Sequence, residues 1–453
     1  MKMAQTKTAG TVEISTKLGK IRGVDTGDCI EFRGIRYATA ERFKKALPVT
    51  KWAGVYDATR FGACCYQRRA FTDDSVTNPF YHKEFRKGLS FTYSEDCLFI
   101  NIWKPKTEGK CPVLVYVHGG SFTGGSGDEG HIRGNAFAKE GVMVVTLNYR
   151  LGPYGFACHP DFTTEDGACG NFGLFDQALA FKWIKENIAD YGGDENNITL
   201  SGQSAGAMSV DMQLSNPDIE GIFSGAILIS GAGLQRFVLK PISPEKEGKE
   251  FWEKIAQKAG LSSVEGLRTL EPDKLFTAWE EAQKEVKLAI RCTLPCYDGY
   301  IVRKGGYNEK TIPDMPYLIG ITTNDMFPAI LEHTTKKWTK YAQRNFRNKC
   351  FVYSFGRALP GDDIGAWHAA DLLYAFKTLD FNWREFEPID YEISDKMFAC
   401  YKAFCENQNP NCREVPRWDS GIEAPMYFGD VTGPRKLETK LFLKNTVKHK
   451  GPI

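Results

Sequence analysis

The residue of this 453-residue chain best placed for nucleophilic chemistry is a serine between glycines. The stretch Gly202-Gln-Ser-Ala-Gly206 matches the pattern G-x-S-x-G, with Ser204 at its centre. Such a serine must lie on a sharp strand-to-helix turn, where the small flanking residues let the backbones approach closely. The β-branched run Ile198-Thr-Leu-Ser201 precedes the motif, and a helix is expected over 205–214. This context predicts Ser204 as the nucleophile of an acyl transfer.

A glycine-rich loop upstream of the serine is suited to stabilising the negative charge that this reaction develops. A tetrahedral intermediate needs fixed N–H donors, and one of them comes from the residue after the nucleophile, here Ala205. The loop His118-Gly-Gly-Ser-Phe122 follows an apolar, strand-like run over 112–118. Taken alone, the loop is more simply a turn. Together with the serine motif, it is expected to supply the other donors.

Three histidines follow Ser204, and a base is expected among them because the order along the chain is serine, acid, histidine. His449 lies in a basic tail with no strand before it, and His333 falls inside a predicted helix. His368 follows the predicted strand 350–355 across a loop, which is where a base at the sheet edge should lie. We therefore predict His368 as the general base, with a purely structural histidine as the alternative.

The acid that orients the imidazole should follow the preceding strand. The run Tyr317-Leu-Ile-Gly-Ile-Thr322 leads into Asp325, which we predict as that acid. Asp298, in an Asp-Gly pair, is more simply a turn residue, and Asp362 and Asp363 lie near the histidine. These three remain alternatives.

The elements that would position these residues alternate between strands and helices. We expect a hairpin over 11–24, strands at 112–118, 142–148, 198–201, 225–230, 317–322 and 350–355, and helices at 174–191, 205–214, 244–259, 273–287 and 328–347. This alternation predicts an α/β fold with a mostly parallel central sheet and helices on both faces. We expect a single domain over 1–453, with helical cap insertions at about 234–312 and 326–348.

Several motifs together resemble the type-B carboxylesterase and cholinesterase family. The match is dense over about 15–232 and rests on Ser94-Glu-Asp-Cys-Leu-Phe-Ile-Asn101, Val117-His-Gly-Gly-Ser-Phe122, Asn148-Tyr-Arg-Leu-Gly152, Gly170-Asn-Phe-Gly-Leu-Phe-Asp-Gln177, Asn187-Ile188, Tyr191-Gly-Gly-Asp194 and Ile198 to Ala207. The resemblance implies the α/β-hydrolase fold and a serine acyl-enzyme. The residues that it implies are the nucleophile Ser204, the oxyanion donors Gly120, Ser121 and Ala205, the acid Asp325 where the family often carries Glu, and the base His368.

The chain also departs from the family pattern. Ser121 replaces a common third glycine, and Gln203 stands where Glu is frequent; neither change removes a catalytic group. Cys65 and Cys97 resemble a disulfide pair of secreted members. No Trp lies between them, so the aromatic residue that binds choline in cholinesterases is missing. We therefore expect a carboxylesterase and not a cholinesterase.

Composition is ordinary for a globular protein, and the charge is nearly balanced. The 58 basic and 56 acidic residues leave a net charge of +2, which gives no reason to expect nucleic acid or an anionic membrane as partner. No run approaches 18 apolar residues, and residues 1–15 lack the apolar core of a secretory signal. We expect a cytoplasmic protein with a small-molecule ester as substrate and with neither cofactor nor metal.

Thirteen cysteines are an odd number, so at least one thiol stays free in a monomer. Cys292 and Cys296, and likewise Cys400, Cys405 and Cys412, lack the C-x2-C spacing of zinc ribbons. Free intracellular thiols are the preferred interpretation.

Two further expectations concern function. The acid and the histidine are only 43 positions apart, which is short for the resembling family and predicts an open, solvent-exposed entrance on the histidine side. The alternatives to an esterase are a catalytically inactive binding module on the same fold, or the same three residues acting on a thioester, amide or carbamate.

Overall fold

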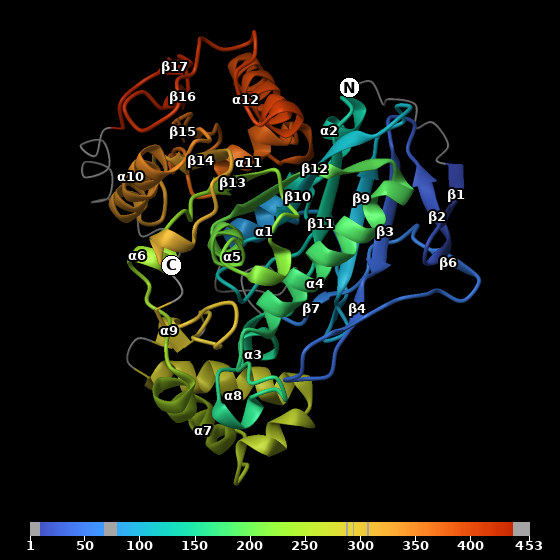
Figure 1. Cartoon of the computed structure of the whole chain (residues 1–453), viewed down its shortest axis with the longest axis vertical. Coiled ribbons are helices and arrows are strands. Elements are labelled where there is room, and N and C mark those ends of the chain that lie inside the picture. Colours follow the sequence, from blue (N-terminus) through green and yellow to red (C-terminus); the bar gives the residue numbers. More distant parts are fainter. Residues whose placement is uncertain (1–9, 68–78, 287–288, 293, 306–307, 438–453) are drawn as a thin grey trace.

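A computed structural model of the chain describes residues 10–67, 79–286, 289–292, 294–305 and 308–437. Its main sheet has the strand order β1-β2-β3-β9-β11-β10-β12-β13-β14-β15-β16-β17, with β6 beside β2 (Figure 1). The strands of this sheet are β1 Gly10–Thr16, β2 Gly19–Asp25, β3 Ile30–Arg36, β6 Val55–Asp57, β9 Phe99–Lys104, β10 Cys111–Val117, β11 Met143–Leu147, β12 Gly193–Gln203, β13 Gly225–Ile229, β14 Tyr317–Thr322, β15 Cys350–Phe355, β16 Met426–Phe428 and β17 Gly433–Pro434.

Two small two-stranded sheets lie outside the main one, formed by β4 Ala38–Thr39 with β5 Leu47–Pro48 and by β7 Cys64–Cys65 with β8 Tyr93–Ser94. The helices of the described residues are α1 Pro79–Phe85, α2 Asn135–Lys139, α3 Gly152–Gly155, α4 Phe172–Asn187, α5 Ala205–Gln213, α6 Leu234–Phe237, α7 Lys249–Lys258, α8 Pro272–Glu285, α9 Ala289–Cys292, α10 Pro328–Asn345, α11 Ala370–Ala375 and α12 Pro388–Asn407. A π-helical turn, Pro244–Gly248, precedes α7.

The sheet is parallel through its centre and antiparallel at its ends. In the sheet order from β11 to β16, neighbouring strands pair in parallel. The pairs β1–β2, β2–β3, β3–β9, β9–β11 and β16–β17 are antiparallel, and the short strand β6 pairs with β2 in parallel. In Figure 1 the N-terminal strands, in blue, lie at one end of the sheet and the C-terminal strands, in red, at the other. The prediction of a mostly parallel sheet between helices is therefore correct, and the predicted hairpin is the pair β1–β2.

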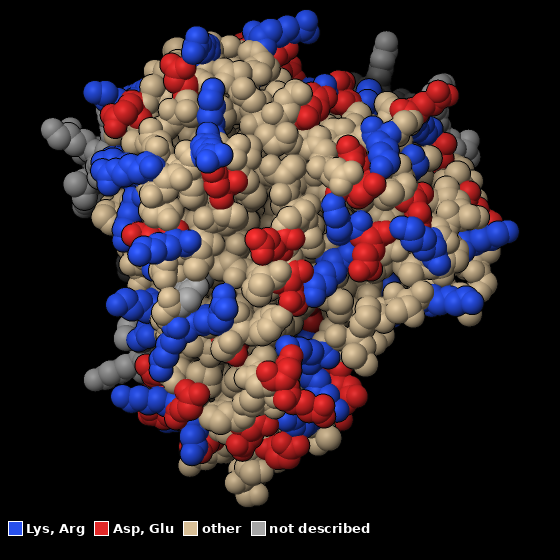
Figure 2. Space-filling model, in the orientation of Figure 1, with Lys and Arg blue, Asp and Glu red and all other residues tan. Residues whose placement is uncertain are grey.

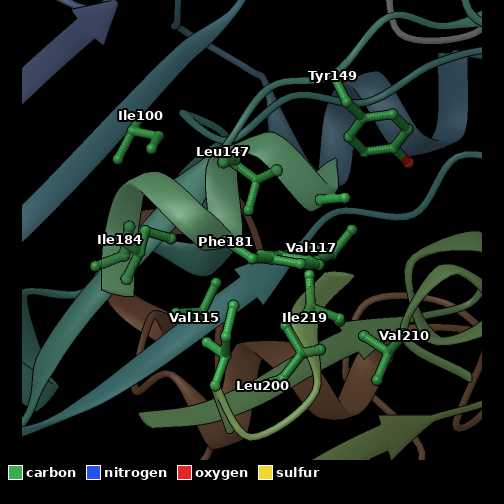
Figure 3. Close-up of a cluster of buried hydrophobic side chains, with 14 of the residues drawn as sticks. Ile100, Val115, Val117, Leu147, Tyr149, Phe181, Ile184, Leu200, Val210 and Ile219 are labelled. Atoms are coloured by element: carbon green, nitrogen blue, oxygen red, sulfur yellow. The ribbon is translucent and has the colours of Figure 1, made fainter. Parts of the chain in front are cut away.

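Alternate residues of the central strands enter two separate cores, one on each face of the sheet. Val113, Val115 and Val117 of β10 pack with α4 and α5, whereas Leu114 and Tyr116 pack with α2, α11 and α12. Figure 3 shows part of the first core, where Val115 and Val117 lie near Phe181 and Ile184 of α4. Because both faces are covered, these strands are apolar at nearly every position, as is usual for parallel sheets.

Helices α7 and α8 pack against each other and lie at the end of the molecule opposite α12 (Figure 1). Their apolar sides form a third core around Trp252 and Trp279, to which Phe43, Tyr154 and Phe162 also contribute. Helix α10, in contrast, connects β14 to β15 and packs against both strands. The segment after Asp325 therefore covers the sheet as a crossover helix.

The parallel strands bring chemically useful residues to one edge of the sheet. The loop 118–122 follows β10, Ser204 follows β12, and Ser230 follows β13. Asp325 comes three residues after β14, and His368 lies in the loop between β15 and α11. In open α/β sheets, ligands usually bind at the edge formed by the carboxyl ends of the parallel strands.

Candidate active site

Ser204 occupies a tight turn between β12 and α5. Its backbone has φ 56° and ψ −124°, a positive-φ conformation outside the left-handed helical region that is strained for a residue with a side chain. The amide N–H of Ser204 donates to the carbonyl of Ile229 at 2.8 Å, which fixes the turn to β13. A Cβ at Gly202 would lie 2.5 Å from the backbone of Gly206, and one at Gly206 would lie 2.1 Å from the carbonyl oxygen of Val117. Both glycines are therefore needed for the turn, which leaves Ser204 half-buried.

The glycine-rich loop after β10 lies directly beside this turn. A Cβ at Gly119 would come within 2.7 Å of the Gln203 carbonyl oxygen and 3.1 Å of the Ser204 Cβ. Gly120 and Ser121 have positive φ, at 107° and 55°, and the carbonyl of Gly120 accepts from two amides farther along the loop. Within the described residues, no hydrogen bond engages the amide N–H of Gly120, Ser121 or Ala205. These three amides are thus available to a ligand near Ser204.

Buried polar residues pack against the glycine-rich loop and hydrogen-bond to it. His118 stacks on Tyr149 at 4.5 Å, and its Nδ1 lies 2.8 Å from the Gly119 carbonyl oxygen. Burial lowers the pKa of His118 to about 4, so the ring is neutral at physiological pH and its Nδ1–H can donate to that carbonyl. Farther along the loop, the Arg86 guanidinium donates to the Glu129 carboxylate at 2.8 Å. The loop is therefore held by buried hydrogen bonds.

Asp325 and His368 are joined by a short hydrogen bond: His368 Nδ1 lies 2.6 Å from Asp325 Oδ1. The other carboxylate oxygen, Oδ2, accepts from the hydroxyls of Ser230 at 2.6 Å and Thr322 at 2.9 Å. The amide of Met326 donates to Oδ1 at 2.7 Å. The amide of Thr322 adds a longer contact to Oδ2 at 3.5 Å, so five donors hold the carboxylate, and the carboxylate in turn orients the imidazole ring.

The acid and histidine loops are also tied together through their backbones. The amide of Asn324 donates to the Ala366 carbonyl at 3.1 Å, and the amide of Ala366 donates to the Asn324 side-chain oxygen at 3.2 Å. A β-bridge joins Asn324 to Trp367. These contacts fix the residues just before His368 relative to the loop that carries Asp325.

Electrostatics favour the charged forms of both partners. Burial alone would raise the pKa of Asp325, but the charge of His368 and hydrogen bonds from His368, Ser230 and Thr322 outweigh it and lower that pKa below its usual value. Burial alone would lower the pKa of His368, but the charge and hydrogen bond of Asp325 outweigh it and raise that pKa. The pair thus suits an imidazole that takes up a proton next to a permanent carboxylate.

The other ring nitrogen of His368 contacts a residue that the sequence did not connect with it. Gln203 Nε2 lies 3.1 Å from His368 Nε2. Within the described residues, no hydrogen bond joins Ser204 Oγ to this nitrogen. Contacts between a nucleophile and its base are often long in ligand-free enzymes and tighten on binding.

The alternatives weighed from the sequence lie in other environments. Asp298 accepts from Asn171 and from the amides of Tyr300 and Val302, so it is a buried turn residue. Asp362 pairs with Arg384, and Asp363 is exposed. His333 is exposed on α10, and His449 lies outside the described residues. The structure thus brings Ser204, Asp325 and His368 to one edge of the sheet but not these rivals.

Two residues of the site were missed by the sequence analysis, namely the acid's hydroxyl donors Ser230 and Thr322. Each lies at the carboxyl end of a buried strand, β13 or β14. A search for polar residues at that position on every parallel strand would have found both.

No group of side chains in the described residues has the arrangement of a metal site. In the same part of the chain, no helix is long and apolar enough to cross a membrane. The face shown in Figure 2 carries Lys and Arg interspersed with Asp and Glu. This face therefore presents no extended field of one sign to a polyanionic partner.

Comparison with known proteins identifies the family. A family model described as "Carboxylesterase family" matches residues 10–350. The chain belongs to the carboxylesterase family. His368 lies beyond the matched residues, so its place in the site rests on the structure.

Curated relatives and solved structures agree with this assignment. The para-nitrobenzyl esterase of Bacillus subtilis (strain 168) is 40% identical over 309 residues, which cover 67% of this chain and 58% of that protein. The fumonisin B1 esterase of Sphingopyxis macrogoltabida is 34% identical over 321 residues, covering 67% and 54%. The chain thus spans little more than half the length of these relatives.

A PNB esterase structure matches with a TM-score of 0.80 at 24% identity, covering 95% of this chain and 98% of that chain. This likeness shows the fold, and the predicted α/β-hydrolase fold is therefore confirmed.

Proposed function

We propose that this chain hydrolyses carboxylic esters through an acyl-enzyme on Ser204, with His368 as general base and Asp325 as its orienting acid. The observation that carries the proposal is the 2.6 Å contact between His368 Nδ1 and Asp325 Oδ1, at the sheet edge that also bears the strained Ser204 turn. Membership of the carboxylesterase family supports the same chemistry. The substrate class is a small-molecule ester.

In the proposed reaction, Ser204 Oγ attacks the ester carbonyl carbon while His368 Nε2 takes the hydroxyl proton. The amides of Gly120, Ser121 and Ala205 donate to the oxyanion that forms. Collapse of the intermediate breaks the bond to the alcohol oxygen, which receives the proton from His368. Water then attacks the acyl-enzyme by the same route, which releases the acid and restores Ser204.

We propose one domain, 1–453, with a helical cap insertion at 234–312, a cytoplasmic location, and an entrance on the histidine side open enough for bulky substrates. The segment 326–348, which was also expected to be a cap insertion, contains instead the crossover helix α10. An ester panel of graded acyl length tests the open entrance: a steep preference for one length would contradict it, because an incomplete apolar wall discriminates poorly.

The direct test of the proposed function is covalent labelling with a fluorophosphonate, followed by mapping of the labelled peptide. We expect the label on Ser204. The Ser204→Ala variant should lose label and about 10⁴-fold or more in kcat on p-nitrophenyl butyrate, while keeping its thermal midpoint. Labelling elsewhere, or retention of a tenth of the parent rate, would contradict the proposal.

A further inference from the structure

The side-chain amide of Gln203 lies between the imidazole and the glycine-rich loop. Its nitrogen is 3.1 Å from His368 Nε2, and its oxygen lies against Gly119, where an added Cβ would come within 2.9 Å. Gln203 is buried, with 4% of its surface exposed. The absence of a side chain at Gly119 is what leaves room for this amide.

The direction of the Gln203–His368 hydrogen bond follows from the other side of the ring. Asp325 is deprotonated at neutral pH and accepts at Nδ1, so the neutral imidazole carries its proton there. Nε2 then has one lone pair and no hydrogen, and the amide nitrogen of Gln203 must be the donor.

The lone pair on Nε2 is the group that has to receive the proton of Ser204. One lone pair cannot accept well from two donors at once, and in this structure the donor is Gln203. Building on the proposed function, we propose that Gln203 is a positioning residue that caps the base in the substrate-free enzyme. Productive binding transfers His368 Nε2 from the Gln203 amide to the Ser204 hydroxyl.

The cap also acts on the protonation state of the base. A hydrogen bond to the lone pair favours the neutral ring, because a protonated Nε2 would set one donor against another. The charged groups that face His368 are Asp325 at Nδ1 and Asp371, which lies in the first turn of α11 and accepts from the Tyr353 hydroxyl at 2.7 Å. Both carboxylates stabilise the protonated imidazole. Gln203, which is uncharged, favours the neutral ring through its hydrogen bond to Nε2.

Two substitutions separate these effects. Gln203→Leu removes the donor at similar volume, so the base no longer has to be uncapped. We expect fluorophosphonate labelling and kcat/KM at alkaline pH to rise about threefold to tenfold, the range that corresponds to one hydrogen bond of ordinary net strength. Gln203→Glu places an acceptor at Nε2, so the acid limb of the kcat/KM profile should move up by about one pH unit or more.

Gln177→Leu is the matched control, because Gln177 is also a buried glutamine but bonds to Ser209 and Gln213 on the face covered by α4. It should leave the acid limb where it is in the parent. Thermal midpoints of all variants identify any loss of fold. Slower labelling in a folded Gln203→Leu variant, or an unmoved acid limb in Gln203→Glu, overturns the cap. Absence of label on Ser204 in the parent enzyme overturns instead the proposed function.

Discussion

The two sides of the site are built by different means. The nucleophile side, comprising the 118–122 loop, Ser204 and the start of α5, is held by backbones in direct contact, with added Cβ atoms meeting neighbours at 2.1–2.7 Å. The histidine side, comprising the loops around Asp325 and His368, is held mainly by side-chain hydrogen bonds. Backbone packing, together with the buried hydrogen bonds of the 118–122 loop, fixes the first side, whereas protonation and donor geometry fix the second. Substitutions on the two sides should therefore fail in different ways.

The largest effect is expected from Asp325→Asn, which leaves the volume unchanged. An amide that donates to Nδ1 holds the imidazole in the wrong tautomer, so kcat should fall about 10⁴-fold with the fold intact. Kinetics with p-nitrophenyl butyrate and circular dichroism check this. A loss below tenfold would mean that another residue supplies the acid.

The corresponding break on the nucleophile side is Gly119→Ala. Its Cβ would lie 2.7 Å from the Gln203 carbonyl oxygen, which is backbone and cannot swing away. We expect the loop to shift and kcat to fall about 10²–10³-fold, as when an oxyanion donor is lost. Gly433→Ala is the control, because no atom lies within 4 Å of the added Cβ. Equal effects of the two substitutions would contradict the packing argument.

The histidine side alone should give the activity its acid limb. The pKa of His368 is raised above the value of about 6.5 for a free histidine. The imidazole must be neutral to accept the proton of Ser204. We expect the acid limb of kcat/KM to have its midpoint above pH 6.5, and kcat/KM to fall about tenfold for each pH unit below that midpoint. Stability has the opposite sign: the contribution of His368 is complete below the unfolded pKa and is lost as pH rises through the folded pKa. A limb well below pH 6 would contradict the assignment of the base.

A smaller effect is expected from Ser230→Ala, which removes one donor from the buried Asp325 carboxylate. At neutral pH the free energy of unfolding should fall by about 1.5–3 kcal/mol, the range for hydrogen bonds to charged groups. The depressed pKa of Asp325 should rise, so this loss should shrink as acid protonates the carboxylate. Ser224→Ala, at the other end of β13, is the control in urea denaturation at several pH values. A loss that does not change with pH would point to packing instead.

The smallest effect is expected from reductant. All thirteen cysteines lie in the described residues and are free thiols, and the hydrogen bond with Cys65 together with burial raises the pKa of Cys97. The thermal midpoint should be the same with and without dithiothreitol. A drop of many degrees would reveal a structural disulfide and contradict the proposed compartment.

The strand and the helix on the nucleophile side could be predicted from the sequence because their signals are local. The G-x-S-x-G motif, its strand and its helix lie within about twenty residues, and β12 and α5 agree with the expected elements. The prediction of Asp325 and His368 rests on a longer inference, from strand ends and chain order. That inference could be made because β14 and β15 are buried at every position and end sharply.

Other features depend on distant pairing and left no local trace. The donors Ser230 and Thr322 reach Asp325 only once β13 and β14 are neighbours. The contact between Gln203 and His368 joins positions 165 residues apart. Helix α12, whose buried face mixes Phe398, Cys400 and Tyr401, was not expected, because aromatic and cysteine residues weaken the helical signal.

The interleaved order of the parallel strands has a consequence for how the protein becomes active after synthesis. β10 lies between β11 and β12, and the site draws on strands from β10 to β15, so no short segment of chain contains it. Each parallel pairing closes a long loop before its contacts form, which makes assembly slow. During refolding, the far-ultraviolet helix signal should therefore recover first. Fluorophosphonate reactivity should return last, and the rate of its return should report how fast β14 and β15 join the sheet.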